Sequence, residues 1–455
     1  MVRLAWFFAF LLAGSNGWAQ TSLSRRQAVE DIDAYVRIMK SSHYHPFMYI
    51  PEGEYNTRLQ AIKNEIGDSV SIRDFVFLFY KVTALLKDAH STPQLGQPVF
   101  REAFGKEQFF PYKLVQKKNK MYAPLQLAAA LGMPAGVEVV DINGVDVSAL
   151  FKQVKERLAG RPSFSEAAAC RLFSYFLFLR GVQPPFALTC KDAKGIQSKA
   201  TIQTGVTFKN ALAASLPHIV QPYRCEVIQN KLGYIDVRSL SVDINGFRAF
   251  LDSCFTQLKQ ASIRHLAIDL RQNSGGNTDL GDLLFSYITR NKYSWGNKSW
   301  KISDAYKDNL RKNGDTTTAY MQRPNGTVWE SADGCRPEEN RFRNERVFEG
   351  KVYFITGPFT FSSAMAVADV VKEYKIATLI GEPTGENTQD FGEAFTIDLP
   401  NSQLKIQSTT SFSHGASCGK TKNGPVLPDV VIRNSLKDDV LEEDPALAYL
   451  LRLIQ

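Results

Sequence analysis

The first part of the chain is patterned for helices. Ser24 and Gln27 have the spacing of a capping box, which opens a helix. Apolar residues then recur every three or four positions, at Val29, Ile32, Val36 and Met39. A second amphipathic helix is predicted to begin near Ser71 and to be stopped by Pro93. We therefore predict a small helical domain over residues 20–97.

Between residues 98 and 205 the pattern changes to short strands and turns. Residues 133–144 predict a strand that ends in a tight Asn143-Gly144 turn. A helix is predicted around Val147–Leu158, and a further strand at Phe186–Cys190. This segment is therefore predicted to be a small β-rich domain.

From about residue 225 strands and helices alternate. Strands are predicted at Leu232–Val237, Leu266–Leu270, Val352–Thr356 and Ile376–Ile380, and helices at Phe247–Lys259, Leu280–Ile288 and Ala364–Tyr374. Such βαβ units form parallel sheets, with functional loops at the carboxyl ends of the strands. Residues 206–455 are therefore predicted to be an α/β domain. A polar segment at about 290–347 interrupts it, either as a lid or as an excursion from the fold.

The N-terminus predicts export. A basic Arg3 precedes an apolar run over residues 4–13, and small residues follow as far as Ala19. This is the pattern of a secretory signal peptide over residues 1–19, so we expect a periplasmic or extracellular protein. No other run approaches the eighteen apolar residues of a membrane-spanning helix, so no integral membrane span is predicted.

Composition limits the classes of partner. The 455 residues are 44% hydrophobic and 22% charged, which is typical of a globular protein with about three domains. The 54 Lys and Arg against 46 Asp and Glu give a net charge of +8 without any run of five like charges, so nucleic acid is not predicted as a partner. Six cysteines at long spacings fit no metal or redox motif, and they leave disulfides and buried thiols open.

Two loops of the alternating region carry candidate chemistry. The first, Asp269–Asn277, contains Gly275-Gly276, and paired glycines let backbone N–H groups face a ligand oxygen as an oxyanion hole requires. The second, Thr356–Met365, puts Ser362-Ser363 at the start of a predicted helix. A serine there is either a helix cap or a nucleophile that the neighbouring N–H groups support.

Five segments of the chain follow one another in a specific order. They are Asp88-Ala89-His90-Ser91, Asp269-x-Arg271-x-Asn273-x-Gly275-Gly276, Phe361-Ser362-Ser363-Ala364, Gly381–Gly385 and Gly424–Asp429. This order resembles the tail-specific (C-terminal-processing) serine peptidase family, in the wider group with the tricorn core protease and the interphotoreceptor retinoid-binding protein. The resemblance implies a crotonase-like (ClpP/crotonase-type) α/β catalytic domain over residues 206–455, preceded by the helical domain and by a PDZ-like domain over 98–205.

The resemblance assigns roles around the nucleophile. Ser362 falls at the position of the family's nucleophilic serine. Gly275 or Gly276, together with the backbone amide of Ser363, would form the oxyanion hole. Neither a cofactor nor a metal is implied.

The base is a point of departure from the family. The tail-specific enzymes use a lysine where this chain has Asn387, and an amide cannot accept a proton at neutral pH. The tricorn-like branch uses a histidine, whose place His90 matches, and a neutral imidazole with a pKa near ~6.5 suits proton abstraction. The acidic partner of this histidine is left open among Glu386, Asp390 and Glu393.

The resemblance therefore implies an exported serine-type endopeptidase. It would cleave peptides or unfolded polypeptides through Ser362, with His90 as the base. The PDZ-like domain would hold the peptide or protein substrate by its C-terminus through strand addition. The alternative is a catalytically inactive member of the same architecture that binds a peptide or a hydrophobic ligand, which Asn387 and Met365 favour. The oligomeric state is left open.

Overall fold

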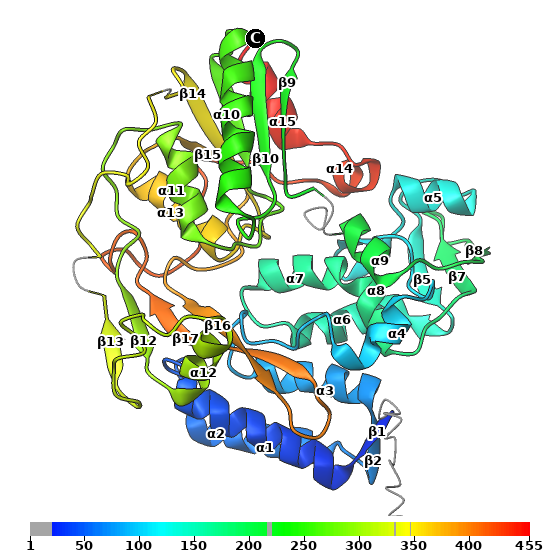
Figure 1. The fold of residues 1–455 in the computed structure, drawn as a ribbon. Coiled ribbons are helices and arrows are strands. Elements are labelled where there is room, and N and C mark those ends of the chain that lie inside the picture. Colours follow the sequence, from blue (N-terminus) through cyan, green and yellow to red (C-terminus); the bar gives the residue numbers. More distant parts are fainter. Residues whose placement is uncertain (1–20, 216–220, 332–333, 346) are drawn as a thin grey trace, which may run out of the picture.

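The computed structural model describes residues 21–215, 221–331, 334–345 and 347–455. The predicted signal peptide, residues 1–19, lies outside these ranges. Figure 1 shows three groups of elements around a central hairpin, with the N-terminal helices below, the elements of residues 98–215 at the right and the largest sheet above. Among the described residues, no helix is both long enough and apolar enough to cross a membrane.

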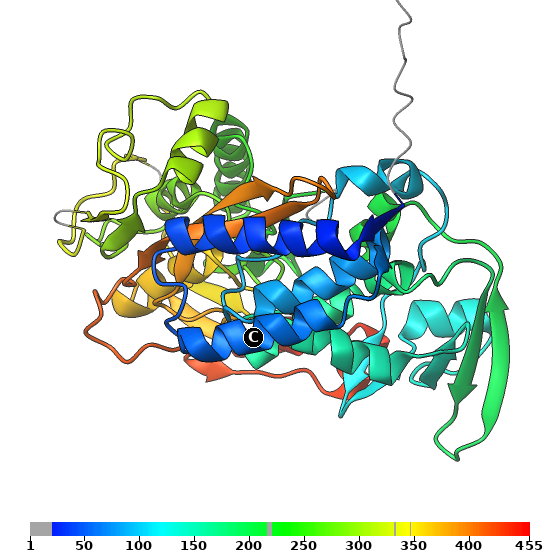
Figure 2. The ribbon, with the colours of Figure 1, turned by 90° about the horizontal axis from the view of Figure 1, so that it is seen from below.

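Three helices dominate the N-terminal group, which Figure 2 shows from below. They are α1 (Arg25–Ser42), α2 (Glu52–Asn64) and α3 (Ile72–Ala84), with β1 (Ser22–Ser24) pairing antiparallel with β2 (Ser69–Ser71). The capping box of Ser24 and Gln27 is present, as predicted. The third helix ends earlier than Pro93 alone would require. Lys87 has a φ of +57°, and this left-handed residue turns the chain before Asp88.

The next group surrounds an antiparallel sheet with the order β3-β4-β5-β7-β8. Its elements are η1 (Pro98–Phe100), α4 (Arg101–Phe104), β3 (Val115–Lys117), β4 (Lys120–Tyr122), α5 (Leu125–Leu131), β5 (Glu138–Ile142), β6 (Val145–Asp146), α6 (Val147–Arg157), α7 (Pro162–Arg171), α8 (Phe173–Leu179), β7 (Phe186–Lys191), β8 (Gln197–Ile202) and α9 (Phe208–Ser215). The predicted turn forms, with positive φ at Asn143 and Gly144. Helix α8 was not predicted because it is buried nearly all round, so its sequence lacks an alternation of apolar and polar positions.

The largest sheet has six strands in the order β18-β15-β14-β11-β10-β9, all parallel except the edge strand β9. The strands are β9 (Tyr223–Ile228), β10 (Leu232–Val237), β11 (His265–Asp269), β14 (Lys351–Thr356), β15 (Thr378–Gly381) and β18 (Val430–Val431). The α/β fold predicted from the alternating pattern is thus confirmed. Helices α10 (Ile244–Gln260), α11 (Thr278–Ser286) and α13 (Ser363–Glu373) cover one face. Helix α15 (Pro445–Leu453), which follows α14 (Leu436–Leu441), packs on the other face.

A four-stranded antiparallel sheet lies between the large sheet and the N-terminal helices (Figure 1). Its centre is the hairpin of β16 (Phe391–Asp398) and β17 (Lys405–Ser413), to which β12 (Lys298–Lys301) and β13 (Val328–Glu330) are added in the order β13-β12-β17-β16. The polar segment at 290–347 therefore extends this sheet, and its helix α12 (Asp304–Lys312) reaches α1.

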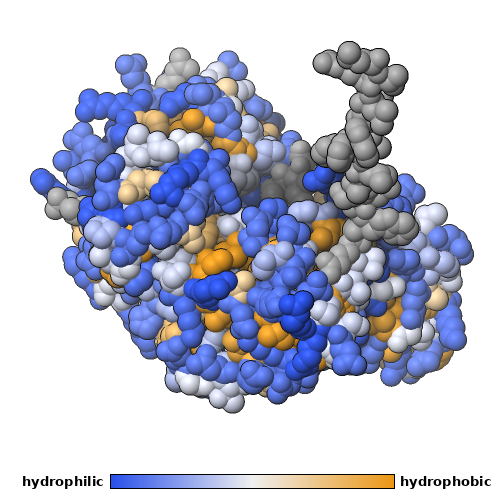
Figure 3. Space-filling model, turned by 60° about the horizontal axis from the view of Figure 1, so that its bottom comes forward, coloured by the Kyte–Doolittle hydropathy of each residue, from blue (hydrophilic) through white to orange (hydrophobic). Residues whose placement is uncertain are grey.

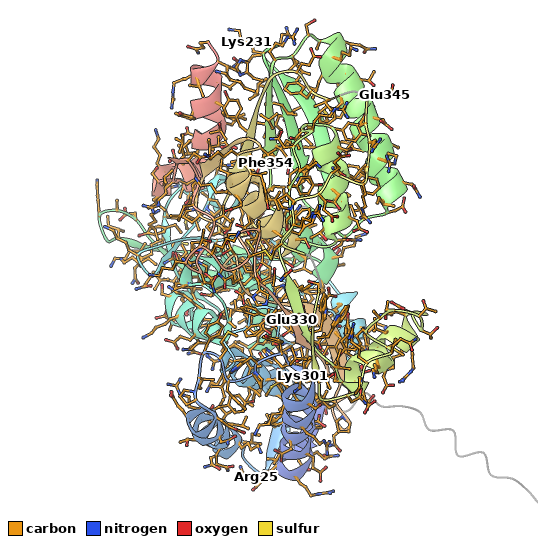
Figure 4. All side chains as sticks on the ribbon, turned by 90° about the vertical axis from the view of Figure 1, so that its left-hand side faces the viewer. Arg25, Lys231, Lys301, Glu330, Glu345 and Phe354 are labelled. Atoms are coloured by element: carbon orange, nitrogen blue, oxygen red, sulfur yellow. A yellow bond between two sulfur atoms is a disulfide. The ribbon has the colours of Figure 1, made fainter. Side chains whose placement is uncertain are left out.

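The hydrophobic core is divided between the two halves of the molecule. One continuous core joins the N-terminal helices, the elements of residues 98–215 and the β16–β17 hairpin, and the large sheet has separate cores on its two faces. In Figure 4, Phe354 of β14 lies among the packed side chains of the upper half, whereas Arg25 of α1 and Lys301 of β12 lie in the lower half. The face drawn in Figure 3 is mostly hydrophilic, with small scattered apolar areas.

Two disulfides connect elements that the sequence could not pair. Cys225–Cys254 joins β9 to α10, and Cys335–Cys418 joins the polar segment to the loop after β17. Cys170 and Cys190 carry free thiols.

Candidate active site

The loop between β14 and α13 places Ser362 at the N-cap of the helix in an unusual backbone conformation. Its φ of 53° and ψ of −128° lie outside the regions that non-glycine residues normally adopt, and such strain persists only where the surroundings fix it. The Phe361 N–H donates to the Asn273 carbonyl at 3.1 Å, and the Gly385 N–H donates to the Thr360 carbonyl at 3.1 Å. Neighbouring loops on both sides therefore hold the turn that presents Ser362.

The glycine pair lies directly against this serine. Gly275 and Gly276 have φ values of 105° and 141°, in the region that favours glycine. A Cβ on Gly275 would lie 2.6 Å from the Ser362 Cβ, and one on Gly276 would lie 2.1 Å from the Leu240 backbone. Both positions thus require glycine, because the loop approaches the serine and strand-end backbone too closely for any side chain.

Two backbone N–H groups at this junction are available for an oxyanion. The Gly275 N–H already donates to Asn273 Oδ1 at 2.8 Å, whereas the N–H groups of Gly276 and Ser363 donate to no acceptor within the described residues. The Ser363 N–H is the first of α13, so it has no partner inside the helix. The Ser363 hydroxyl donates to the Gly276 carbonyl at 2.7 Å and ties the two loops together.

His90 reaches the same place from the turn after α3. Its ring lies 4.7 Å from the ring of Phe361, the residue before Ser362, and its side chain is 14% exposed. Its Nδ1 lies 3.5 Å from Glu386 Oε1 and 3.7 Å from Asp88 Oδ1. The structure therefore brings together the predicted Ser362, His90 and glycine loop, although they come from distant parts of the sequence.

Glu386 is the acid that touches both predicted catalytic residues. It is 3% exposed, and its Oε2 accepts a hydrogen bond from the Ser362 N–H at 2.5 Å while Oε1 faces His90. Glu393 instead pairs with Lys298 and accepts a hydrogen bond from Tyr306, and Asp390 accepts one from the Phe391 N–H. Of the three acidic candidates, Glu386 has the geometry of an orienting partner.

Helix α7 forms one wall of the site. Phe164 stacks on Phe361 at 4.4 Å and on Phe359 at 5.6 Å, measured between ring centroids. Arg161, at the N-cap of α7, donates to Asn387 Oδ1 at 2.9 Å. Sequence reasoning missed both residues, because no local pattern indicates a contact between segments about 200 residues apart.

The electrostatics of the site differ from the sequence expectation. Burial disfavours the charged form of His90, but the carboxylates of Glu386, Asp88 and Asp390 outweigh it and raise its pKa to about 9. Burial also raises the pKa of Glu386 and that of Asp390. The value near 6.5 expected for an unperturbed histidine is therefore corrected upward. The surrounding carboxylates therefore favour the cationic form of His90.

His43 lies beside the carboxylate of Asp88, next to the site. Across the described ranges, no group of three His, Cys, Asp or Glu side chains is arranged to hold a metal ion. His43 is 1% exposed and its Nε2 lies 3.3 Å from Asp88 Oδ2.

Comparisons with known proteins place the chain next to a peptidase family and to solved structures of similar fold. Residues 231–432 match the model of Peptidase family S41, and no curated protein matches the chain. Mature CPAF complexed with lactacystin superposes with a TM-score of 0.62 at 15% identity, over 94% of this chain and 97% of that chain. Mature CPAF without the inhibitor gives 0.62 at 16% identity, over 94% and 96%. The photosystem II D1 C-terminal processing protease gives 0.44 at 14% identity, over 92% and 98%.

Proposed function

We propose, from the membership of residues 231–432 in peptidase family S41, that this serine-type peptidase hydrolyses peptide bonds with Ser362 as nucleophile and His90 as general base. The observation that carries the assignment is the position of Glu386. Its carboxylate accepts the Ser362 N–H and faces His90 Nδ1, so one buried acid lies against both groups. A nucleophile, a base and an orienting acid together make up a catalytic triad.

The proposed reaction begins with attack of the Ser362 hydroxyl oxygen on the scissile carbonyl. His90 takes the hydroxyl proton, and Glu386 stabilises the imidazolium that forms. The N–H groups of Gly276 and Ser363 stabilise the negative charge that develops on the carbonyl oxygen. His90 then gives its proton to the leaving amine, and water hydrolyses the acyl-enzyme.

The base requires a change in charge when substrate binds. An imidazolium cannot accept a proton, so catalysis needs His90 in its neutral form. The raised pKa places this form at alkaline pH. We therefore expect kcat/KM, which reports the free enzyme, to rise through an apparent pKa above 7 instead of between 6 and 7.

The finer parts of the function are also proposals. We assign a crotonase-like fold to residues 206–455, which the largely parallel six-stranded sheet supports, and a PDZ-like role to residues 98–205, which the separate antiparallel sheet of that segment supports. A peptide or protein substrate would bind there in extended form by its C-terminus.

We further propose an exported enzyme, which the two disulfides support because such bonds persist in oxidising compartments.

Labelling by a fluorophosphonate probe tests the proposal, since the probe reacts only with an activated serine. We expect the wild-type chain to be labelled, Ser362→Ala to lose all labelling, and Ser363→Ala to retain part of it. Ser363 contributes its N–H, and its hydroxyl only contacts the Gly276 carbonyl. Folded wild-type protein that is not labelled would instead support the inactive ligand-binding alternative.

A further inference from the structure

We propose that Asp88 is a positioning residue of this active site, which fixes the backbone of His90 and, together with Glu386, stabilises its cationic ring. The inference rests on the proposed role of His90 as the base. It adds a second carboxylate to the side of the imidazole that faces away from the substrate. The following contacts carry it.

Asp88 is a fully buried carboxylate surrounded by donors. Its exposed fraction is 0%, and four groups donate to it: His43 Nε2 at 3.3 Å, the Ser91 hydroxyl at 2.6 Å, the Thr409 hydroxyl at 2.8 Å and the His90 N–H at 2.9 Å. These donors come from the end of α1, from β17 and from the turn that carries His90. Asp88 therefore fixes the turn against two other parts of the fold.

The two carboxylate oxygens of Asp88 have different hydrogen-bond partners. The side chains of His43, Ser91 and Thr409 all donate to Oδ2. Oδ1 accepts the His90 backbone N–H and lies 3.7 Å from His90 Nδ1. His90 Nδ1 thus faces both Asp88 and Glu386, which leaves Nε2, on the opposite edge of the ring, for the serine or the leaving group.

His43 donates to Asp88 through its Nε2. The His43 Nδ1 accepts a hydrogen bond from the His45 N–H at 3.2 Å, so the proton of a neutral ring lies on Nε2, which faces Asp88. Burial disfavours the charged carboxylate, but the hydrogen bonds and charges of His43 and His90 hold the pKa of Asp88 well below its usual range. Asp88 therefore keeps a buried negative charge, and of its two histidine partners His90 is the one whose ring lies beside Phe361 of the catalytic loop.

The remaining charged groups near His90 do not replace Asp88. Glu386 and Asp390 approach from the loop before β16, and both have raised pKa values. Glu393 lies farther along β16 and is paired with Lys298. Tyr49 has a pKa raised to about 12, chiefly by burial, and stays neutral. Asp88 and Glu393 are thus the carboxylates of this cluster whose pKa values are lowered, and of these two Asp88 is the one that lies against His90 Nδ1.

Asp88→Asn removes the charge and keeps the shape. The amide oxygen can still accept the His90 N–H, and the hydroxyls of Ser91 and Thr409 can accept from the amide nitrogen, whereas the His43 Nε2–H loses its acceptor. We expect the acidic limb of the kcat/KM profile to move to lower pH by about 1–3 units, the usual effect of an opposite charge within 4–6 Å. We also expect kcat on the alkaline plateau to fall by about tenfold or more.

Asp31→Asn is the matched control. Asp31 is also 0% exposed, and it accepts hydrogen bonds from the N–H groups of Asn401 and Ser402 at 2.8 Å, in the turn of the β16–β17 hairpin. No histidine contacts it in the hydrogen-bond network of the described residues. Asp31→Asn should lower Tm, as the replacement of a buried, hydrogen-bonded aspartate does. The acidic limb of its kcat/KM profile should stay at the wild-type pH.

Thr409→Val provides a second test that does not depend on the fold tolerating Asp88→Asn. It keeps the charge and removes one donor from Oδ2, which makes the carboxylate a stronger partner for His90. The acidic limb should then move to higher pH, opposite to Asp88→Asn. The role of Asp88 is overturned if the acidic limb stays at the wild-type pH in both variants. If Asp88→Asn does not fold, an unchanged limb in Thr409→Val alone overturns it. If wild-type labelling is intact in that case, the proposed function stands.

Discussion

The nucleophile and the base are held in place in different ways. Ser362 lies where β14 leads into α13, and backbone hydrogen bonds from two adjacent loops of the same sheet fix its turn. His90 lies outside that sheet, in a turn held by the side-chain contacts of Asp88 and by the ring of Phe361. The geometry of the nucleophile therefore follows from the loops of one sheet, whereas the geometry of the base requires several segments to pack together.

Because of this difference, the nucleophile and the base should respond differently to mutations. Backbone hydrogen bonds between loops at the carboxyl ends of the strands persist as long as the sheet is folded. The nucleophile should therefore tolerate changes elsewhere in the molecule. Side-chain contacts between separate segments can be altered one at a time without unfolding the sheet. Variants on the base side should thus change the rate and its pH dependence, whereas variants on the nucleophile side should change whether the serine is reactive at all.

The largest effect is expected from His90→Ala. Removing a general base costs typically 10²–10⁴-fold, so we expect kcat/KM to fall by at least about 10². The nucleophile loop makes its backbone hydrogen bonds without His90, so circular dichroism and Tm should stay close to the wild type. Activity that survives with an unchanged pH profile would remove the histidine from the mechanism.

Gly275→Ala tests the nucleophile side with an effect of about 10²-fold. The added Cβ would lie 2.6 Å from the Ser362 Cβ and 3.0 Å from the Ser363 nitrogen, so the serine or the oxyanion donors must move. The measurement is kcat with a peptide substrate.

Gly132→Ala is the control for backbone strain in that experiment. Gly132 also has a positive φ, of 65°, but nothing lies within 4 Å of the added Cβ. Its activity should stay at the wild-type level while its stability falls by about 1 kcal/mol. Equal losses of activity in the two variants would mean that strain, and not the approach to Ser362, explains the result.

The smallest effect is expected from Asn387→Ala, at less than about tenfold in kcat/KM. Asn387 accepts one hydrogen bond from Arg161, so its loss only loosens the contact between α7 and the catalytic loops. A typical hydrogen bond contributes about 0.5–1.5 kcal/mol. A loss as large as that of His90→Ala would instead give Asn387 a chemical role.

Local signals in the sequence predicted the first and third helices and the alternation of the large sheet, but not the β16–β17 hairpin. The capping box of Ser24, the Asn143-Gly144 turn and the alternation of the large sheet depend on neighbours in the sequence, and all three formed. Helix α8 was missed because burial on all sides leaves no periodic pattern. Short motifs made Ser362 and the glycine pair candidates for the site, and these residues lie together in the structure.

The environment of the base could not be predicted from such signals. Glu386 was one of three acids, and only the packed structure shows that its carboxylate contacts both the Ser362 N–H and His90. The raised pKa of His90 likewise depends on carboxylates about 300 residues away in the chain. Contacts of that range leave no trace in a single sequence.

The division of the site between early and late parts of the chain bears on how the protein is made. During synthesis from the N-terminus, His90 leaves the ribosome first, Ser362 much later and Glu386 later still. Strand β17, whose Thr409 contacts Asp88, follows them all. An incomplete chain therefore lacks a working set of catalytic groups, so hydrolysis can begin only after nearly the whole polypeptide has been translated and folded.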